Sequence, residues 1–396
     1  MEAAQKNWKC SACGYIHTGP TPPDLCSVCG APADLFVEEE ASAPTPAPVI
    51  DTQDYLAAWQ RKEDELEPRF VRLQELATTG KTEISAMGTH LPSVDWSEIL
   101  FYGAQLDRMP LEKGEDVRTE TVVGKTAAHP LELEIPFYVS HMSFGALSRE
   151  AKIALARGSS ALGTAIGSGE GGMLEAEREH ARRYIYELGT ASFSQVESSI
   201  RAADAVEIKI GQAAKPGMGG HLPADKVTDE IAAIRNLEPG EDSISPSRQP
   251  DIASRDDLRR KVEGLRELTG GRPIGVKITA GRIEKDLEFL LSSGPDFVTI
   301  DCRGGGTGAA PTVVKDNVCL PAIYALRRAR RFLDEKRSPV TLCVTGGFRD
   351  SSDIAKALAL GADAVALATA SMIAIGCQQY RICHTGRCPV GIATQD

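Results

Sequence analysis

Seven of the ten cysteines stand in two tight groups, at spacings that suit metal ligands. Near the end of the chain, Cys377, Cys383 and Cys388 form a C-x5-C-x4-C pattern, and a proline follows the last of them. Three thiolates in such a pattern favour an iron–sulfur cluster that lacks one iron, or one that takes a further ligand from elsewhere. The alternative is that the three cysteines are structural and cap a domain.

The other group lies near the start of the chain, where Cys10, Cys13, Cys26 and Cys29 form C-x2-C-x12-C-x2-C. Each C-x2-C-G turn directs backbone N–H groups toward the sulfurs, and two such turns give tetrahedral coordination. Both iron and zinc accept four thiolates. The surrounding sequence resembles the rubredoxin module of rubrerythrins, which implies one iron rather than the zinc of a zinc ribbon. Ser27 departs from the proline usual after the third cysteine.

Composition limits the classes of function. The chain has 396 residues, of which 42% are hydrophobic, and a net charge of −11, which argues against a nucleic-acid partner. The first residues lack the apolar core of a signal peptide. The most apolar run, 354–377, contains Lys356 and Asp363, so no membrane span is expected. Clustered cysteines without a secretory signal predict a reducing, cytoplasmic location.

Changes in composition predict the domain organisation. We expect a metal module over residues 1–37 and, over 38–50, an acidic and then Pro/Ala-rich segment that acts as a linker. Residues 51–134 are expected to wrap the next domain, with a helical pattern from Tyr55 to about Leu76 that Pro68 interrupts. The main domain then occupies 135–396.

Apolar strands alternate with amphipathic helices from Ile135 onward. Strands are predicted within 135–143, 163–169, 191–196, 205–210, 273–280, 297–304, 340–347 and 364–370. Eight strands with intervening helices predict an α/β fold of the (β/α)8 TIM-barrel type, with a doubly wound open sheet as the alternative. The connection between the fourth and fifth strands is too long for a plain loop and is expected to form a lid.

Glycines concentrate where strands end, in 167–172, 215–220, 303–311 and 345–347. Glycine lets backbone N–H groups approach a phosphate or a flat ring closely. Four such sets on one barrel face predict a phosphorylated cofactor. Barrels of this type hold phosphate after the seventh and eighth strands, here at Gly346, Gly347, Ala368 and Thr369.

Several segments in order, including "MSFGALS", "GSGEGG", "QAAKPGMGGHLP", "GGGTGAAP" and the final cysteine motif, resemble the FMN-binding synthase domain of glutamate synthases. The resemblance covers about residues 85–396. It implies that Cys377, Cys383 and Cys388 bind a 3Fe-4S cluster beside FMN.

The resemblance also implies roles for single residues. Glu170 would be the active-site glutamate, and Lys277 would stabilise the reduced flavin near its N1–C2 carbonyl edge. Lys215 would contact substrate, although it and Gln212 could equally be loop contacts. A pairing of Glu170 with a loop lysine is the structural alternative for that residue. The residues expected to bind the cofactor are Met142, Ser143, Gly145, Gln212, Lys277, Gly305, Gly306, Gly346, Gly347, Ala368 and Thr369.

The chain departs from the family pattern at His141, where a proline is usual, at Met218, where a glutamate is usual, and at 248–250, where paired histidines are usual. These departures concern the lid and the substrate. The sequence also shows no glutaminase domain and no dinucleotide-binding motif for NADPH, so nitrogen and electrons are expected to arrive from outside.

The sequence therefore predicts an iron–sulfur flavoprotein that reductively aminates a 2-oxo acid with ammonia, by default 2-oxoglutarate to L-glutamate. The expected partners are a protein electron donor (a ferredoxin or an NAD(P)H-oxidising flavoprotein), a separate glutaminase subunit and further copies of this chain in a homo-oligomer. The alternatives are a subunit similar to that of N-methylglutamate synthase and an electron-transfer flavoprotein without its own substrate.

Overall fold

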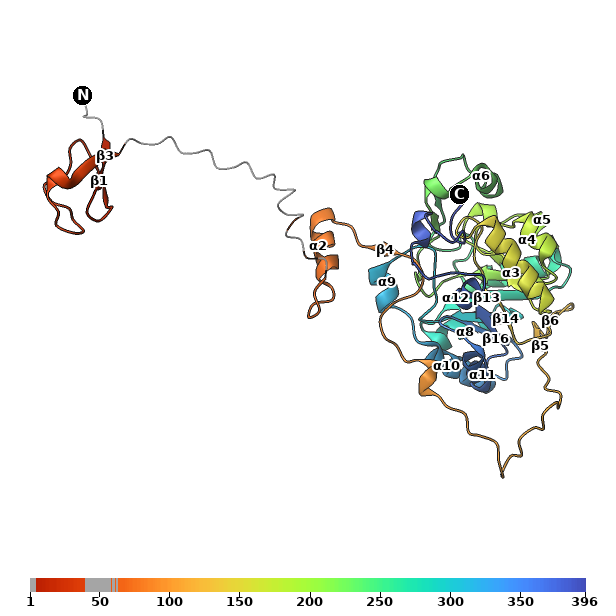
Figure 1. The fold of residues 1–396 in the computed structure, drawn as a ribbon. Helices are drawn as coiled ribbons and strands as arrows, with labels where there is room; N and C mark the ends of the chain where they lie inside the picture. Colours follow the sequence, from red (N-terminus) through yellow and green to blue (C-terminus); the bar gives the residue numbers. More distant parts are fainter. Residues whose placement is uncertain (1–4, 40–57, 59–60, 62) are drawn as a thin grey trace. The chain divides into compact units, whose positions relative to one another are not determined.

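The computed structural model describes residues 5–39, 58, 61 and 63–396, and the chain divides into two compact units, Met1–Val71 and Arg72–Asp396 (Figure 1). Most of the expected linker, 40–50, lies outside the described residues, as do residues 55–57 of the expected first helix. A helix does follow Pro68: α2 spans Phe70–Thr79. Within the described part of the chain, every helix is too short or too polar to cross a membrane.

The N-terminal unit is a small antiparallel sheet with the strand order β2-β1-β3. Its elements are β1 (Lys6–Cys10), β2 (Ile16–Gly19), η1 (Ala33–Leu35) and β3 (Phe36–Glu39). Among the residues that the structure describes there, the buried core comprises Cys10, Cys26, Ala31 and Phe36, with Trp8 and Tyr15 packed against it. So few apolar side chains supply little stabilisation, and a small unit of this kind depends on a bound metal.

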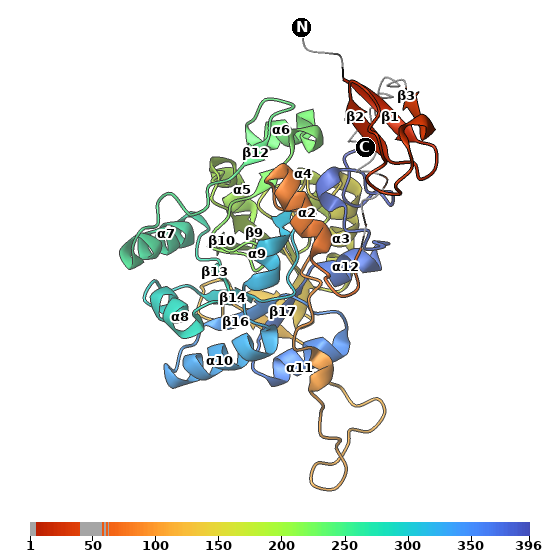
Figure 2. The ribbon, with the colours of Figure 1, turned by 90° about the vertical axis from the view of Figure 1, so that its left-hand side faces the viewer.

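The second unit is built on a closed barrel of eight parallel strands, which confirms the predicted fold class (Figure 2). The strands are β7 (Phe137–Val139), β8 (Ile166–Gly167), β9 (Tyr184–Leu188), β10 (Ala205–Lys209), β13 (Ile274–Thr279), β14 (Phe297–Asp301), β16 (Thr341–Thr345) and β17 (Ala364–Leu367). The prediction of the third strand within 191–196 is wrong. That segment contains a short 3-10 helix, η3 (Ser192–Ser194), and the strand is the preceding run "YIYEL".

Helices surround the barrel, and the strands' outward side chains pack under them in one large core. The ring comprises α3 (Arg149–Ala161), α4 (Glu175–His180), α5 (Glu197–Ala202), α7 (Arg255–Leu268), α8 (Ile283–Leu291), α10 (Ala322–Glu335), α11 (Ser351–Ala359) and α12 (Thr369–Ala374). Side chains alternate along each strand, so every second residue points into the barrel. In β9, Ile185 and Glu187 therefore share the interior, whereas Tyr184, Tyr186 and Leu188 pack outward.

A hairpin closes the amino-terminal end of the barrel. It consists of β5 (Thr121–Val123) and β6 (Leu131–Leu133), which pair antiparallel. Val123, Leu131 and Leu133 pack with apolar barrel residues such as Phe297 in a second buried core. The lower barrel is thus dry and apolar, and polar interior side chains gather in the upper part.

The long connection between β10 and β13 covers the carboxyl end of the barrel, as the sequence predicted. It contains β11 (His221–Leu222), η4 (Ala224–Lys226), α6 (Asp229–Arg235) and β12 (Ser243–Ile244). Apolar side chains of α6 pack on Phe144 in a third core. Near the end of the lid, Gln249 is buried and its amide nitrogen lies 3.1–3.2 Å from the carbonyl oxygens of Leu188, Gly189 and Lys209. Gln249 thus fastens the lid to two strands.

The remaining elements bring residues 72–98 across the barrel's loops. β4 (Ile84–Ser85) pairs antiparallel with β15 (Ala310–Pro311), just before α9 (Thr312–Asn317). Farther on, η2 (Trp96–Glu98) is followed by the long segment that leads to β5. A last 3-10 turn, η5 (Cys383–Thr385), lies within the C-terminal cysteine motif.

Gly275 of β13 provides a test of the barrel's interior packing. A Cβ at Gly275 would lie 2.2 Å from the ring of Phe297, which is fully buried. We expect Gly275→Ala to destabilise the protein by about 1–3 kcal/mol, because the ring has no free space to enter. Gly264→Ala on the exposed side of α7 is the matched control. Its Cβ meets open space, so the helix should gain up to about 1 kcal/mol. Denaturant unfolding followed by circular dichroism measures both changes, and equal effects would contradict this account of the core.

Candidate active site and metal centres

A cavity opens at the carboxyl end of the barrel, beneath the lid. Its lining combines loop residues that follow the strands with interior charges from β9, β10 and β13. The residues are Met87, His141, Met142, Ser143, Ala146, Leu147, Gly169, Glu170, Glu187, Lys209, Gln212, Lys215, Gly220, His221, Leu222, Arg235, Ser245, Lys277, Gly306, Thr307, Gly308, Ala309, Ala368, Thr369, Met372 and Cys383. The cavity therefore unites most of the predicted site residues with several that were not predicted.

Lys277 lies in the middle of β13, two residues before its end, and is 5% exposed. Its ammonium donates a hydrogen bond to Glu187 and lies 3.6 Å from Glu207. Burial lowers the pKa of Lys277, but the two carboxylates outweigh burial and raise it above its usual value. Lys277 therefore stays charged, as an electrostatic role near a cofactor requires.

Glu187 and Glu207 are buried, and each faces more than one basic group. Besides Lys277, Lys209 lies 3.5 Å from Glu187, and the Nε2 atom of His141 lies 2.9 Å from Glu207. Burial raises the pKa of both carboxyls, but the neighbouring basic groups outweigh it and hold both values below the usual range. The basic neighbours thus keep two carboxylates ionised in a dry interior.

Glu170 lies at the cavity and forms an ion pair, 2.6 Å long, with Lys209 at the end of β10. Burial raises the pKa of Glu170, yet Lys209 outweighs it and lowers the value. Lys209 was missed by sequence reasoning. The signal was present, because in "AVEIK" the charged residues Glu207 and Lys209 alternate with the apolar residues Val206 and Ile208, so the charged pair shares the side that faces into the barrel. The pairing is the structural alternative considered for Glu170, with a strand lysine in place of a loop lysine.

Three of the lid residues that line the cavity carry side chains able to bind a polar ligand. Gln212 donates from its side-chain amide to the carbonyl oxygen of Gly306 over 2.9 Å. Lys215 is buried, and burial together with Lys209 lowers its pKa to about 8. Arg235, which was also missed, ends α6 and donates to the carbonyl oxygen of Phe144 over 2.9 Å. Its Nε atom is buried without a hydrogen-bond partner, which leaves one donor for a bound molecule.

The predicted glycine loops line two further cavities beside the first. The second and third cavities are both lined by Gly304, Gly346, Gly347 and Thr369. The third is also lined by Gly305, and by Gly306 and Ala368, which face the first cavity as well. A Cβ at Gly346 would lie 2.3 Å from the carbonyl oxygen of Cys302, so no larger residue fits without movement. The backbone of these loops can therefore approach a ligand closely.

Three arginines that the sequence did not single out, Arg303, Arg349 and Arg381, line the cavity next to these glycines. They come from the loops after β14 and β16 and from the C-terminal cysteine segment. Arginine binds phosphate with its planar fork of donors, so the three support the expected phosphate position.

The loop after β7 lies between the barrel and the lid. Met142 and Ser143 line the main cavity. The buried Lys152 fixes this loop, since its ammonium donates to the carbonyl oxygens of Met142 and, over 2.7 Å, of Ser168. Gly145 is absent from the cavity lining and instead packs against the lid, because a Cβ there would lie 2.7 Å from Leu222. Its structural contribution is close contact with the lid.

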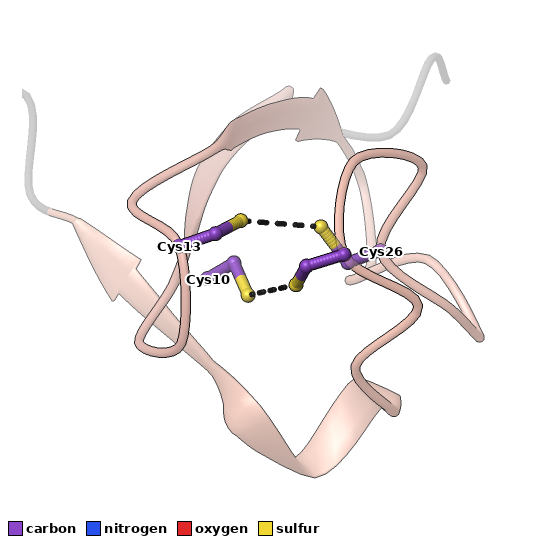
Figure 3. Close-up of side chains that lie close together, drawn as sticks. Cys10, Cys13 and Cys26 are labelled. Carbon is purple, nitrogen blue, oxygen red and sulfur yellow. Dashed lines mark hydrogen bonds between the residues drawn. The ribbon is translucent and has the colours of Figure 1, made fainter.

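The four N-terminal cysteines are arranged for one metal ion (Figure 3). The sulfur of Cys10 lies 3.7 Å from that of Cys29, and the sulfur of Cys13 lies 3.6 Å from that of Cys26. A metal ion with sulfurs at 2.3 Å in a tetrahedron separates them by about 3.8 Å, so the four atoms fit one ion. Burial raises the pKa of Cys26, but backbone N–H groups of Cys29 and Val28 outweigh it and lower the value to about 7.

The three C-terminal cysteines are spaced differently. Among the described residues, the groups whose ligand atoms lie within 4.8 Å of one another include the four N-terminal cysteines but not Cys377, Cys383 and Cys388. Sulfurs that bind different irons of one cluster must stand farther apart than sulfurs on a single ion. Backbone N–H groups lower the pKa of Cys388 although burial raises it, and Lys226 donates to the carbonyl oxygen of Cys383 over 3.0 Å. Cys383 also lines the main cavity.

The residues at the barrel mouth fit a flat, phosphorylated cofactor such as FMN. Gly347 lines both smaller cavities, and a Cβ there would have no protein atom closer than 3.6 Å, so its absence leaves room for a ligand; Lys277 and the arginines supply positive charge. Asp301 lines the third cavity with its Oδ1 atom buried and without a hydrogen-bond partner, and burial raises its pKa to about 6. A polar ligand group would satisfy this orphaned oxygen.

Comparison with known proteins agrees with this arrangement. Residues 82–396 match the model of the conserved region in glutamate synthase, and residues 8–37 match that of the rubredoxin-like domain of rubrerythrin. A glutamate synthase large subunit-like protein of Rhizobium meliloti is 39% identical over 348 residues, which cover 83% of this chain and 79% of that protein.

Archaeal-type glutamate synthase (NADPH) of Thermotoga maritima is 34% identical over 389 residues, 90% of this chain and 75% of the relative. Among solved structures, a mandelate oxidase mutant with a monooxide FMN adduct aligns with a TM-score of 0.44 and 17% identity, over 72% of this chain and 73% of the other. The chain thus belongs to the glutamate synthase family, as an oxidoreductase acting on CH–NH2 donors with an FMN-type synthase region and a rubredoxin-like module.

Proposed function

We propose that this chain is an iron–sulfur flavoprotein that reductively aminates a 2-oxo acid, by default 2-oxoglutarate to L-glutamate. The observation that carries the proposal is a single cavity that unites the paired Glu170, the charged Lys277, the lid cations and Cys383. No pure electron-transfer role would need a lid with buried cations over such a cavity.

FMN, when bound, supplies hydride transfer to the substrate carbon. The phosphate would be held by Gly346, Gly347 and the neighbouring arginines, and the ring by the loop after β7. Lys277 places a fixed positive charge in a dry site, where it stabilises negative charge far more than it would in water. Glu187 and Glu207 hold that lysine in place.

The substrate would lie between the lid and the barrel mouth. Lys215 and Arg235 are cations of the lid that face the cavity, and they suit the two carboxylates of a dicarboxylic 2-oxo acid. Glu170 is placed to hold the nitrogen of ammonia or of the imine and to move its proton. Lys209 keeps Glu170 ionised, so it begins the reaction as a proton acceptor.

Electrons would come from a protein donor, a ferredoxin or an NAD(P)H-oxidising flavoprotein, through the metal centres. We assign an iron ion to Cys10, Cys13, Cys26 and Cys29, and a 3Fe-4S cluster to Cys377, Cys383 and Cys388. The support is the sulfur spacing of the first set and the position of Cys383 beside the cavity. A separate glutaminase subunit would supply ammonia.

Stepwise kinetics with Glu170→Gln test the reaction. Anaerobically reduced enzyme should be reoxidised by 2-oxoglutarate together with ammonia, and by neither alone. In the variant, reduction by dithionite should be unchanged, and reoxidation should slow by about 10²-fold, because the amide cannot accept a proton. Stopped-flow absorbance of the flavin measures both steps.

Glu197→Gln on α5 is the control, since that carboxylate is exposed and its one ion pair within the described residues is with Arg201 along the helix. It should leave both steps unchanged. Equal slowing of reduction and reoxidation in Glu170→Gln would place Glu170 in flavin binding instead. If 2-oxoglutarate and ammonia together fail to reoxidise the reduced wild-type enzyme, this substrate pair is excluded.

The pKa of Lys215 predicts a pH dependence. A lysine with a pKa of about 8 is charged below that pH and loses its charge above it. If Lys215 binds a substrate carboxylate, kcat/KM for the 2-oxo acid should fall as pH rises through about 8. Lys215→Arg should shift this fall to higher pH, because the guanidinium stays charged. A pH profile of kcat/KM that is identical in the two proteins would remove Lys215 from substrate binding.

Deletion of residues 1–45 tests the relay. The remaining chain should stay folded, since its barrel and core lie wholly beyond that segment. Dithionite should still reduce the flavin, whereas reduction by the protein donor should slow greatly. Full-length protein with zinc at the four cysteines is the matched control, because zinc keeps the fold of the module but carries no electrons. Donor reduction at the wild-type rate in both proteins would make the module a structural appendage.

A further inference from the structure

Residues 100–120 form a long extension that leaves the barrel and returns to it, visible in Figures 1 and 2 between η2 and β5. Every residue of this segment is exposed, and none belongs to a helix or strand. We call residues 100–118 the arm.

Both ends of the arm are fixed to the barrel unit. Before it, Trp96 is buried against Phe348, with ring centroids 5.1 Å apart, and its carbonyl oxygen accepts a hydrogen bond from Lys356 over 2.8 Å. After it, the hydroxyl of Thr119 donates to the carbonyl oxygen of Glu134, and β5 pairs with β6. The extension is therefore a firmly anchored projection from the barrel.

The arm itself is unsupported. Within the described residues, its one backbone hydrogen bond is a turn from the N–H of Glu115 to the carbonyl oxygen of Glu112, and no ion pair joins it to the rest of the chain. A polar loop could remain in water without such contacts to the rest of the protein. The arm instead exposes seven large apolar side chains: Leu100, Phe101, Tyr102, Leu106, Met109, Leu111 and Val117. Tyr102 is fully exposed and Leu106 is 88% exposed.

This surface is too apolar for a segment surrounded only by water. Seven such side chains present on the order of 700 Å² of apolar surface, more than the largest patch of a typical monomer. At about 25 cal/mol per Å², the unburied surface forgoes a large stabilisation. The arm is therefore shaped to pack on another molecule.

We propose that the arm packs on a second copy of this chain and forms a two-fold symmetric dimer. In such a dimer each copy contributes its own arm, so the two together bury on the order of 1,400 Å², the size of a stable interface, before the surfaces beneath them are counted. Charge permits this pairing. The whole chain has a net charge of −11, so two copies repel each other. The arm itself has four acidic and three basic residues and is nearly neutral.

The test is the mass of the full-length protein in solution, measured by sedimentation velocity over a dilution series at micromolar concentrations. The wild-type chain should be a dimer. Tyr102→Glu with Leu106→Glu should halve the mass, because two charges would be placed in the buried interface. A second variant replaces residues 101–117 with a short Gly/Ser loop between the two fixed ends and should also be monomeric. Circular dichroism of both variants should match that of the wild type.

Tyr324→Glu is the control, because Tyr324 is a 52% exposed aromatic residue on α10 outside the arm. It should leave the dimer intact. A monomeric wild-type chain across the dilution series would overturn the proposal and leave the arm to a different protein. A dimer that survives both arm variants would overturn it equally, since the interface would then lie elsewhere.

Discussion

Glu187 is the point on which the active-site end of the barrel depends. Its carboxylate is buried beside three basic side chains: Lys277 of β13, Lys209 of β10 and His141 of the loop after β7. A lone buried carboxylate would cost several kcal/mol, and removal of one partner from such a pair is strongly destabilising. Strands β9, β10 and β13 must therefore keep their register so that these opposite charges stay paired. Parallel pairing sets that register, with Glu187 beside Glu207 and Lys209 beside Lys277.

This constraint explains the division of the barrel interior. The lower part is filled by Phe297, Ile185 and the hairpin side chains, and it needs no water. The upper part carries charge, which is tolerated only where ion pairs and the lid complete the hydrogen bonding. The orphaned Oδ1 of Asp301 and the free Nε of Arg235 mark where that completion is still open. These unpaired polar atoms cost stability at the barrel mouth, and they leave hydrogen-bonding groups free for a charged ligand.

The sequence predicted the barrel, the lid and the N-terminal cysteine cluster because each has a local signal: period-two strands, an overlong connection and cysteine spacing. It failed at the third strand, although the true strand "YIYEL" has three strand-forming residues in five and "ASFSQV" only two in six, so a local signal was present and was misread. Lys209 was missed although the alternation in "AVEIK" marks it, whereas Arg235 and the three arginines were missed for a different reason. Each is an ordinary charged residue in the chain, and its position becomes visible only when distant loops meet.

The two cysteine sets are held in the fold in two different ways. The N-terminal four are held by their own turns, where Gly14 and Gly30 adopt positive φ and donate back to Cys10 and Cys26. That unit is self-contained. The C-terminal segment is instead fastened to the loop after β7: Ser148 bonds to Ile392 and Gly391, and Gln395 bonds to the carbonyl oxygens of Gly145 and Leu147. The same loop lines the cavity. The residues that follow the cysteines and the loop that lines the cavity are therefore held together by one set of hydrogen bonds.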